Sequence, residues 1–365
     1  MGLTIVTAVW AVFVALSWWS PIRAGRWGVA AFLLSVTVNE VPIVLLVVFV
    51  ASLAAQVPTA LTWNDWLPAA LAGFVVVGLV WLQVRAASSW ARLAAAMGME
   101  PAKGGGWGVW AGGILLLFQR HRRGVRRHRN LAYGSEGRAH RLDVYRGSDQ
   151  SQERPIVIHL HGGGFVQGGK SRESVVLLNQ LAAHGWLCIS ANYLLRAAGV
   201  FPHSLVDAKH VIVWAKEHAA EYGADPTQIF LVGTSAGGHL ALSAALTQND
   251  PELQPNFEDR DTTVAGVVVL YGYLGPRTTD PSSSPAALVH PDAPPALMIH
   301  GSHDSMVASV GPRSVATALR DVSRAPVVWI ELPHTQHNFD LFASVRARMV
   351  ANATLTFLER VRTRG

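Results

Sequence analysis

The sequence has 365 residues, half of them hydrophobic, and its 30 lysines and arginines against 24 carboxylates give a formal charge of +6. This length is sufficient for two domains, and the single cysteine, Cys188, excludes an intramolecular disulfide. Ten of the 13 tryptophans lie between Trp10 and Trp110, whereas nearly all carboxylates lie from Glu136 onward. We therefore expect an N-terminal membrane region and a separate C-terminal domain.

Three apolar runs, Leu3–Trp19, Val29–Ala55 and Leu67–Leu82, dominate the first part of the chain. The first run has the length of a short spanning helix, and it lacks the basic start that a signal peptide needs. We predict that residues 1–85 form a transmembrane region of about three helices.

Glu40 interrupts the second apolar run, and Pro42 follows it closely. A carboxylate at mid-membrane is costly. We interpret Glu40 as protonated or close to an interface, with Pro42 marking a kink. The alternative is a polar site inside a helix bundle.

The distribution of basic residues predicts the orientation of these helices. Arg23 and Arg26 lie in the first loop, whereas the second loop, Gln56–Trp66, has no basic residue. Because basic loops tend to stay cytoplasmic, we expect a multi-pass membrane protein with an outside N-terminus and a cytoplasmic C-terminal domain. If Trp107–Phe118 also crossed the membrane, the domain would lie outside, but this run is short for a span.

Residues 86–131 are predicted to form a linker, in which Trp107–Phe118 is an interfacial helix. A basic cluster follows this helix and favours an anionic membrane surface over nucleic acid as the partner. No zinc-finger or RNA-binding signature accompanies it, and a solvated linker without a partner is the alternative. The cluster consists of Arg120, Arg122, Arg123, Arg126, Arg127 and Arg129.

Residues 132–365 show short apolar runs that alternate with helical patterns, which predicts an α/β fold with a mostly parallel sheet. In such sheets the active site lies at the carboxyl ends of the strands. The predicted strands are Arg141–Tyr145, Pro155–Leu160, Trp186–Tyr193, Gln228–Val232, Val264–Tyr271, Ala296–His300 and Val327–Leu332. The predicted helices are Ser174–His184, Ser204–Tyr222, Gly237–Leu246, Val310–Val322 and Leu341–Arg362.

A Gly-x-Ser-x-Gly pattern around Ser235 follows one of these strands and precedes a helix. Strand, tight turn and helix are the context of a nucleophile elbow. The turn is strained, so that small residues must flank the serine, and Gly233 and Gly237 meet this need. By itself the pattern also fits an ordinary Gly/Ser turn.

Three glycines, Gly162 to Gly164, follow His161 at the end of another predicted strand. Exposed N–H groups of such a loop can stabilise the oxyanion that forms during acyl transfer. We predict that Gly163, Gly164 and the residue after the nucleophile, Ala236, supply these donors. A phosphate-binding loop that includes Lys170 and Ser171 is a weaker alternative.

A serine nucleophile needs a histidine to accept its proton and a carboxylate to orient that histidine. In this fold class the acid and then the histidine follow the serine along the chain. Asp304 and His337 each follow a late predicted strand, which makes them the preferred partners of Ser235. The weaker candidates are Asp280, Asp292 and His334.

These motifs, in this order, resemble the α/β-hydrolases of the hormone-sensitive-lipase-like group, the bacterial family IV esterases. The resemblance covers the chain from about Tyr133 and rests on four segments: His161–Gly164, Gly233–Gly238, His300–Asp304 and His337–Phe339. It implies an α/β-hydrolase fold, a triad of Ser235, Asp304 and His337, an HGGG-type oxyanion hole and an ester substrate. Thr234 stands where many relatives have aspartate, and Asp207 is expected to be structural.

The expected cap differs from that of the group. Gly272–Pro295 is short, and Trp107–Arg129 with the membrane region occupies the position of an N-terminal cap. We hypothesise that the helix over Trp107–Phe118 serves as the lid and that substrate arrives from the bilayer or its surface.

We therefore predict a membrane-anchored serine carboxylester hydrolase that acts on a small-molecule or lipid ester and needs no cofactor. The pairs His159 with His161 and His300 with His303 lack a third ligand at metal spacing, so we expect no metal site. An amide or carbamate hydrolase, or a non-catalytic membrane binding protein on this scaffold, is the alternative. The sequence leaves the oligomeric state and the acyl chain length open.

Overall fold

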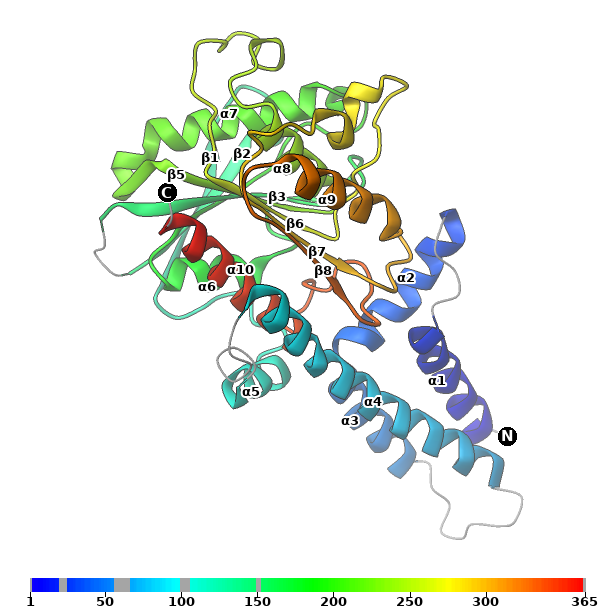
Figure 1. The fold of residues 1–365 in the computed structure, drawn as a ribbon. Coiled ribbons are helices and arrows are strands. Elements are labelled where there is room, and N and C mark those ends of the chain that lie inside the picture. Colours follow the sequence, from blue (N-terminus) through cyan, green and yellow to red (C-terminus); the bar gives the residue numbers. More distant parts are fainter. Residues whose placement is uncertain (1, 20–24, 56–65, 99–105, 149–151, 364–365) are drawn as a thin grey trace.

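The computed structural model describes residues 2–19, 25–55, 66–98, 106–148 and 152–363. A sheet with helices on both faces forms one part, and a bundle of N-terminal helices extends away from it (Figure 1). Arg23 and nearly all of the second predicted loop lie outside the described residues.

The sheet has eight strands in the order β1-β2-β4-β3-β5-β6-β7-β8. The first two strands in this order join the sheet through antiparallel pairs, and all the pairs from β4 to β8 are parallel. The strands are β1 (Val125–Ala132), β2 (Arg141–Gly147), β3 (Arg154–Leu160), β4 (Leu187–Ala191), β5 (Ala224–Thr234), β6 (Gly266–Leu270), β7 (Ala296–Gly301) and β8 (Val327–Leu332).

Every residue of β3, β4, β6 and β7 is buried, because a parallel sheet needs cover on both faces. One hydrophobic core contains α7, α8 and α9, and the second contains α6, α10 and the end of α4. These helices are α4 (Trp66–Met97), α6 (Val175–Ala183), α7 (His203–His218), α8 (Ala236–Leu246), α9 (Val310–Val322) and α10 (Val345–Arg362). Short 3-10 helices include η3 (Arg196–Gly199), η4 (Ala219–Tyr222), η5 (Pro251–Leu253), η6 (Pro281–Ser283) and η7 (Pro285–Leu288).

The strand order reverses between β3 and β5, since β4 lies on one side of β3 and β5 lies on the other. Loops that leave the carboxyl ends of two such strands diverge and open a crevice between them. The predicted glycine loop follows β3 and the predicted nucleophile follows β5. The fold therefore brings both motifs to the same edge of the sheet.

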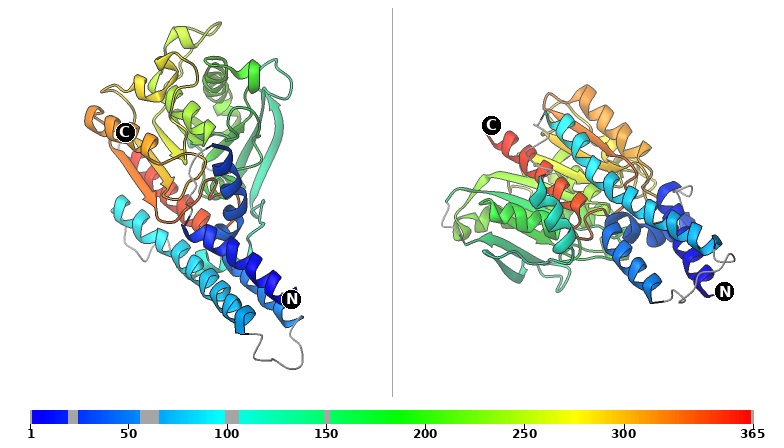
Figure 2. Two further views of the ribbon diagram at one scale, coloured as in Figure 1. Left: turned by 90° about the vertical axis from the view of Figure 1, so that its right-hand side faces the viewer. Right: turned by 90° about the horizontal axis from the view of Figure 1, so that it is seen from below.

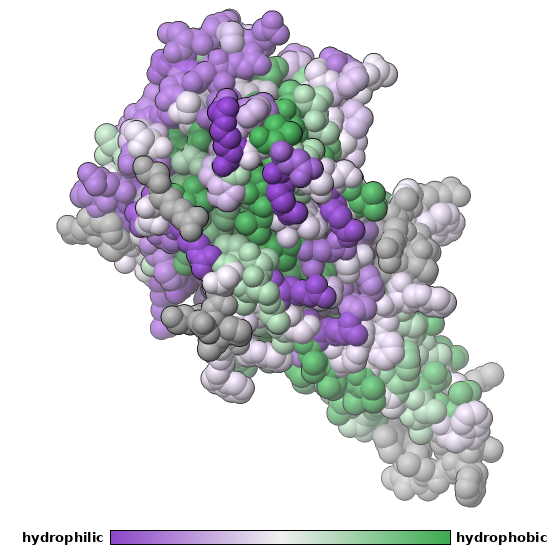
Figure 3. All heavy atoms as spheres, in the orientation of Figure 1, coloured by the Kyte–Doolittle hydropathy of each residue, from purple (hydrophilic) through white to green (hydrophobic). Residues whose placement is uncertain are grey.

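The helical extension contains α1 (Gly2–Trp19), α2 (Gly25–Glu40), α3 (Pro42–Ala54) and the first part of α4. Its end carries the N-terminus in all views (Figures 1 and 2), and hydrophobic residues form patches along the face of it that Figure 3 shows. Among the described residues, α1 and α4 are long and apolar enough to cross a membrane, and the bent α2–α3 pair could count as a third span.

The second apolar run does not form the single helix that a simple span would need. It is divided into α2 and α3, which meet at an angle of 88°. The bend falls at Val41, directly before Pro42, because proline fits the first turn of a helix but not its interior. The predicted kink at Pro42 is thus present.

The prediction of a linker over residues 86–131 is wrong at both ends of this range. The third apolar helix continues to Met97, and Trp90 and Leu93 on it are buried in a core of the sheet domain. At the other end, β1 pairs with β2 as the edge of the sheet. Only α5 (Trp107–Leu115) resembles the expected element, and it is shorter than predicted.

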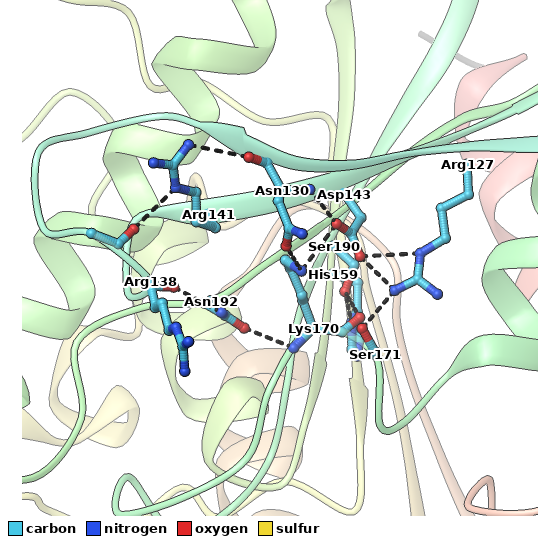
Figure 4. Close-up of polar contacts among 11 residues, drawn as sticks. Arg127, Asn130, Arg138, Arg141, Asp143, His159, Lys170, Ser171, Ser190 and Asn192 are labelled. Carbon is cyan, nitrogen blue, oxygen red and sulfur yellow. Dashed lines mark hydrogen bonds and ion pairs between the residues drawn. The ribbon is translucent and has the colours of Figure 1, made fainter.

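One arginine of the predicted basic cluster is bound within the sheet domain. The Nε of Arg127, on β1, lies 3.1 Å from a carboxylate oxygen of Asp143 on β2, and the ammonium of Lys170 lies 3.0 Å from the other oxygen (Figure 4). The side chain of Asp143 is fully buried, so that two cations surround a charge that water does not reach. Arg127 is therefore a structural residue of the sheet edge.

Candidate active site

Ser235 lies in a strained turn between β5 and α8. Its backbone has φ 51° and ψ −116°, a conformation that L-residues rarely adopt. An added Cβ at Gly233 would lie 2.1 Å from the Gly237 carbonyl oxygen, and one at Gly237 would lie 2.0 Å from the Leu160 carbonyl oxygen. Both flanking positions therefore require glycine, as the Gly-x-Ser-x-Gly pattern predicted.

The structure brings the three predicted catalytic side chains into one hydrogen-bonded chain. The Nε2 of His337 lies 2.9 Å from the Oγ of Ser235, and its Nδ1 lies 2.6 Å from the Oδ2 of Asp304. All three residues are buried. They come from the turn after β5, the loop after β7 and the loop after β8, all at one edge of the sheet.

Asp304 is held as an anion by more partners than the sequence indicated. Its Oδ1 accepts hydrogen bonds from the backbone N–H groups of Met306 and Val307, and the Nε2 of His300 lies 3.2 Å from its Oδ2. Burial opposes ionisation, but His337 and His300 more than offset it and hold the pKa of Asp304 well below its usual range. The carboxylate can therefore stabilise a positive charge on His337.

The predicted oxyanion loop lies directly beside Ser235. Gly164 and Ala236 line the same pocket as the serine, and no described hydrogen bond uses the N–H groups of Gly163, Gly164 or Ala236. Gly163 has φ 128°, and an added Cβ there would lie 1.8 Å from the Gln167 carbonyl oxygen. These donors are free to bind a ligand oxygen.

Glu173, which the sequence analysis did not identify, joins the glycine loop to the elbow. Its Oε2 accepts hydrogen bonds from the N–H of Gly162 and from the hydroxyl of Thr234, each at 2.7 Å. This contact uses the hydroxyl of Thr234, the residue that directly precedes Ser235. His161 lies alongside, with its Nδ1 2.7 Å from the Gly162 carbonyl oxygen and its ring stacked on Tyr193.

A second buried carboxylate, Asp340, lies behind the histidine. It accepts hydrogen bonds from Ser174 and from the hydroxyl of Tyr271, whose ring contacts the imidazole of His337 edge-on. Burial and the neighbouring charge of Glu173 raise the pKa of Asp340 to about 6. The imidazole thus rests against a ring whose position a buried hydrogen bond fixes.

Helix α2 of the N-terminal extension also reaches the loops that carry Asp304 and His337. Phe32 contacts the His337 ring edge-on, with centroids 6.1 Å apart, and the Gly28 carbonyl accepts a hydrogen bond from Ser305. The amide of Gln336 donates to Ser35, while its oxygen accepts from the N–H groups of Ser305 and His337. Gln336 therefore joins the acid loop, the histidine loop and α2.

The hypothesis that the helix over Trp107–Phe118 forms the lid is not supported. Helix α5 packs on α10, where an added Cβ at Gly113 would lie 2.5 Å from the Val345 nitrogen. None of its residues lines the pocket that contains Ser235. The apolar pattern alone could not distinguish this helix from α2, which occupies the position beside His337.

The weaker candidates lie elsewhere. Asp280 caps η6, Asp292 forms an exposed ion pair with Arg324, and the ring of His334 contacts Trp81. Residues 164–171 fit the spacing of a phosphate-binding loop, Gly-x-x-x-x-Gly-Lys-Ser. However, Asp143 and Asn130 bind the ammonium of Lys170, so it does not extend toward a ligand as that loop requires.

The histidine pairs have structural contacts in the described part of the chain. The Nδ1 of His159 lies 2.8 Å from the hydroxyl of Ser190, and the ring of His303 contacts His334. The described residues contain no group of three or more His, Cys, Asp or Glu side chains arranged to hold a metal ion. Asp207 pairs with His140 and accepts from the N–H of Leu194, consistent with the structural role expected of it.

The pocket beside Ser235 has a volume of about 530 Å³, within the range of small-molecule sites. Ser235, Ala236, Gly164 and His337 form one part of its lining. Apolar and aromatic side chains form most of the rest, and two arginines complete it. These other residues are Phe165, Val166, Arg196, Tyr273, Pro276, Arg277, Met306 and Val307.

Known proteins share this fold and much of this sequence. The BD-FAE family model matches residues 142–280. The probable carboxylic ester hydrolase LipM of Mycobacterium tuberculosis is 33% identical over 99% of this chain and 93% of its own length. Esterase LipQ of the same organism is 37% identical over 65% of this chain and 63% of its own length. The structure of Thermogutta terrifontis esterase 2 phosphoramylated by tabun has a TM-score of 0.56 at 22% identity, covering 66% of this chain and 95% of that one.

The mostly parallel sheet and these relatives define an esterase of the α/β-hydrolase type. Because the similarity to LipM extends over nearly the whole of both chains, the protein belongs to the carboxylic ester hydrolase family that includes LipM. It is an enzyme that hydrolyses esters.

Proposed function

We propose that the protein is a membrane-anchored serine carboxylester hydrolase of the hormone-sensitive-lipase-like group. The hydrogen-bonded chain from Ser235 through His337 to Asp304 is the observation that carries the proposal. A serine beside a histidine that a buried carboxylate orients is the arrangement that activates a hydroxyl for attack on an acyl carbon.

In the proposed reaction, Ser235 attacks the carbonyl carbon of the ester and His337 accepts its proton. The N–H groups of Gly163, Gly164 and Ala236 stabilise the oxyanion, since none of them has another described acceptor. His337 then donates the proton to the departing alcohol. Water attacks the acyl-enzyme with His337 as the base, and the acid leaves.

A fluorophosphonate probe tests the role of Ser235, because only an activated serine reacts with it at a useful rate. We expect the purified full-length chain to be labelled at Ser235, as measured by mass spectrometry of its peptides. The matched control is the heat-inactivated chain, in which the same serine should not react. Labelling at another serine, or none at all, would contradict the proposal.

The proposed substrate is a lipid or small-molecule ester that the enzyme meets close to a bilayer. Support comes from the apolar helices α1 and α4, from the hydrophobic surface of the extension (Figure 3) and from the contact between α2 and the catalytic loops. We further propose that membrane lipids surround α1, α3 and the first part of α4. The sheet domain then lies at one membrane face.

The proposed orientation places the N-terminus outside and the sheet domain in the cytoplasm. In Figure 1, α1 and α4 run toward the sheet domain and α3, the second half of the bent α2–α3 pair, runs away from it. If that pair counts as one span, this arrangement fits three passages. A green fluorescent protein fused after Gly365 should fluoresce, whereas alkaline phosphatase at the same position should be inactive. If the phosphatase fusion were active and the green fluorescent protein fusion did not fluoresce, the sheet domain would lie outside.

A further inference from the structure

Two arginines reach the ester pocket from different loops. Arg196 begins η3, and Arg277 lies between β6 and η6. Both line the pocket that contains Ser235, and the lining includes no aspartate or glutamate. Within the part of the chain that the structure describes, neither guanidinium has a carboxylate partner.

The guanidinium of Arg277 is held in a fixed place. Its central carbon lies 3.6 Å from the centroid of the Phe165 ring. Its terminal nitrogens donate to the hydroxyl of Ser204 at 2.7 Å and to the carbonyl of Gly199 at 2.8 Å. Two of its five N–H groups are thereby used by neutral acceptors, and the described contacts leave the other three free.

Arg196 is fixed beside the same segment of the glycine loop. Its backbone N–H donates to the Phe165 carbonyl at 2.7 Å, and its Nε donates to the Val166 carbonyl at 3.0 Å. The residue has φ 58°, which is costly for a side chain other than glycine. Its terminal nitrogens have no described acceptor.

The charge of Arg277 lacks a described carboxylate to balance it, whereas Arg196 is exposed to water. Arg277 is half-buried, and burial lowers its pKa. The Phe165 ring compensates only in part. A planar guanidinium binds carboxylate and phosphate oxygens through two parallel hydrogen bonds, and the free donors of both arginines are available for such a group.

We propose that Arg277 and Arg196 form an anion subsite in the ester pocket. The substrate is then an ester that carries an anionic oxygen group, a carboxylate or a phosphate, near the scissile bond. The inference rests on the proposed hydrolysis at Ser235 and adds the chemical class of its substrate. A carboxylate on a soluble ester and a phosphate on a lipid headgroup are the two sources of this chemistry.

Matched pairs of substrates separate the charge from the size of the substrate. The soluble pair is 4-nitrophenyl hexanoate and the mono-4-nitrophenyl ester of adipic acid, which differ by a terminal carboxylate. The lipid pair is 1-oleoylglycerol and 1-oleoylglycerol 3-phosphate. The full-length chain in neutral detergent should prefer the anionic member of at least one pair by about 10- to 100-fold in kcat/KM, after subtraction of the uncatalysed rate. The pair that shows the preference identifies the source.

Variants then assign the preference to the two arginines. Arg277→Gln and Arg196→Gln should each reduce the ratio of anionic to neutral kcat/KM by about tenfold, and Arg277→Lys should retain part of it. Arg324→Gln, at an exposed arginine outside the pocket, is the control and should leave the ratio unchanged. A purely structural role for Arg277 would lower both rates alike and leave the ratio unaltered.

The results separate a failure of the proposed anion subsite from a failure of the proposed ester hydrolysis at Ser235, on which the subsite rests. If the wild-type chain hydrolyses both members of each pair equally, or if the glutamine variants keep the preference, the anion subsite is wrong although ester hydrolysis stands. If no member of either pair is hydrolysed and the fluorophosphonate probe does not label Ser235, the proposed function itself fails.

Discussion

Replacing Ser235 by alanine is expected to lower kcat for a soluble 4-nitrophenyl ester by about 10⁴- to 10⁶-fold. The variant loses the proposed nucleophile but keeps the proposed oxyanion donors of Gly163, Gly164 and Ala236, so that a small rate above that of water should persist. Initial rates with the purified full-length chain in detergent measure the effect. The Cβ of alanine fits the elbow, and the variant should unfold at the temperature of the wild-type chain.

Two controls make this expectation specific to the triad. Ser314→Ala, at an exposed serine on α9 whose hydroxyl bonds only its own helix, should leave the rate unchanged. The double variant Ser235→Ala with His337→Ala should be about as slow as either single variant, because groups that act as a unit do not contribute additively. A Ser235→Ala variant with near-normal turnover would overturn the mechanism.

Much of the sheet domain could be predicted from the sequence. Seven of its strands follow apolar runs bounded by glycine, proline or polar residues, and Val327–Leu332 has the predicted bounds. The edge strand β1 was missed because its sequence, Val-Arg-Arg-His-Arg-Asn-Leu-Ala, is mostly basic. Such a pattern is typical of a solvated linker, and only pairing with β2 and burial of Asp143 between two cations makes it a strand.

The parts of the candidate site that depend on local backbone geometry could be predicted from the sequence. The glycines around Ser235 and in the loop after His161 are required by close contacts that a Cβ would break. Asp304 and His337 follow from chain order and from their places after β7 and β8. Each of these signals lies within a few residues of the side chain that it identifies.

The contacts that join distant segments could not be predicted in this way. Ser35 and Gln336 are 301 positions apart, and neither residue type has a spacing that indicates its partner. Arg277 lies in a loop rich in proline and serine, where a charged residue is ordinarily solvated. Its place over Phe165 depends on how two loops fold together. Tertiary packing, rather than local pattern, decides such sites.

Glu40→Ala is expected to destabilise the chain by about 3–5 kcal/mol, because it leaves the guanidinium of Arg346 buried without its partner. Glu40 ends α2 and forms an ion pair with Arg346 on α10, while the hydroxyl of Ser344 donates to its other oxygen at 2.9 Å. The side chains of Glu40 and Arg346 are 0% and 1% exposed. This contact fastens the helix that touches His337 to the sheet domain. Loss of esterase activity on heating should therefore occur on the order of 10 °C lower.

An exposed ion pair serves as the matched control that tests whether burial of the Glu40–Arg346 pair causes the loss of stability. Asp292 and Arg324 also form an ion pair, but their side chains are about three-quarters exposed, so Asp292→Ala should change stability by less than about 1 kcal/mol. The double variant Glu40→Met with Arg346→Leu should recover most of the loss, because it removes both buried charges and keeps the volume filled. Equal effects of Glu40→Ala and Asp292→Ala would show that α2 is not fastened by this ion pair. Recovery in the double variant is the result expected if the loss in Glu40→Ala comes from the unpaired buried charge of Arg346.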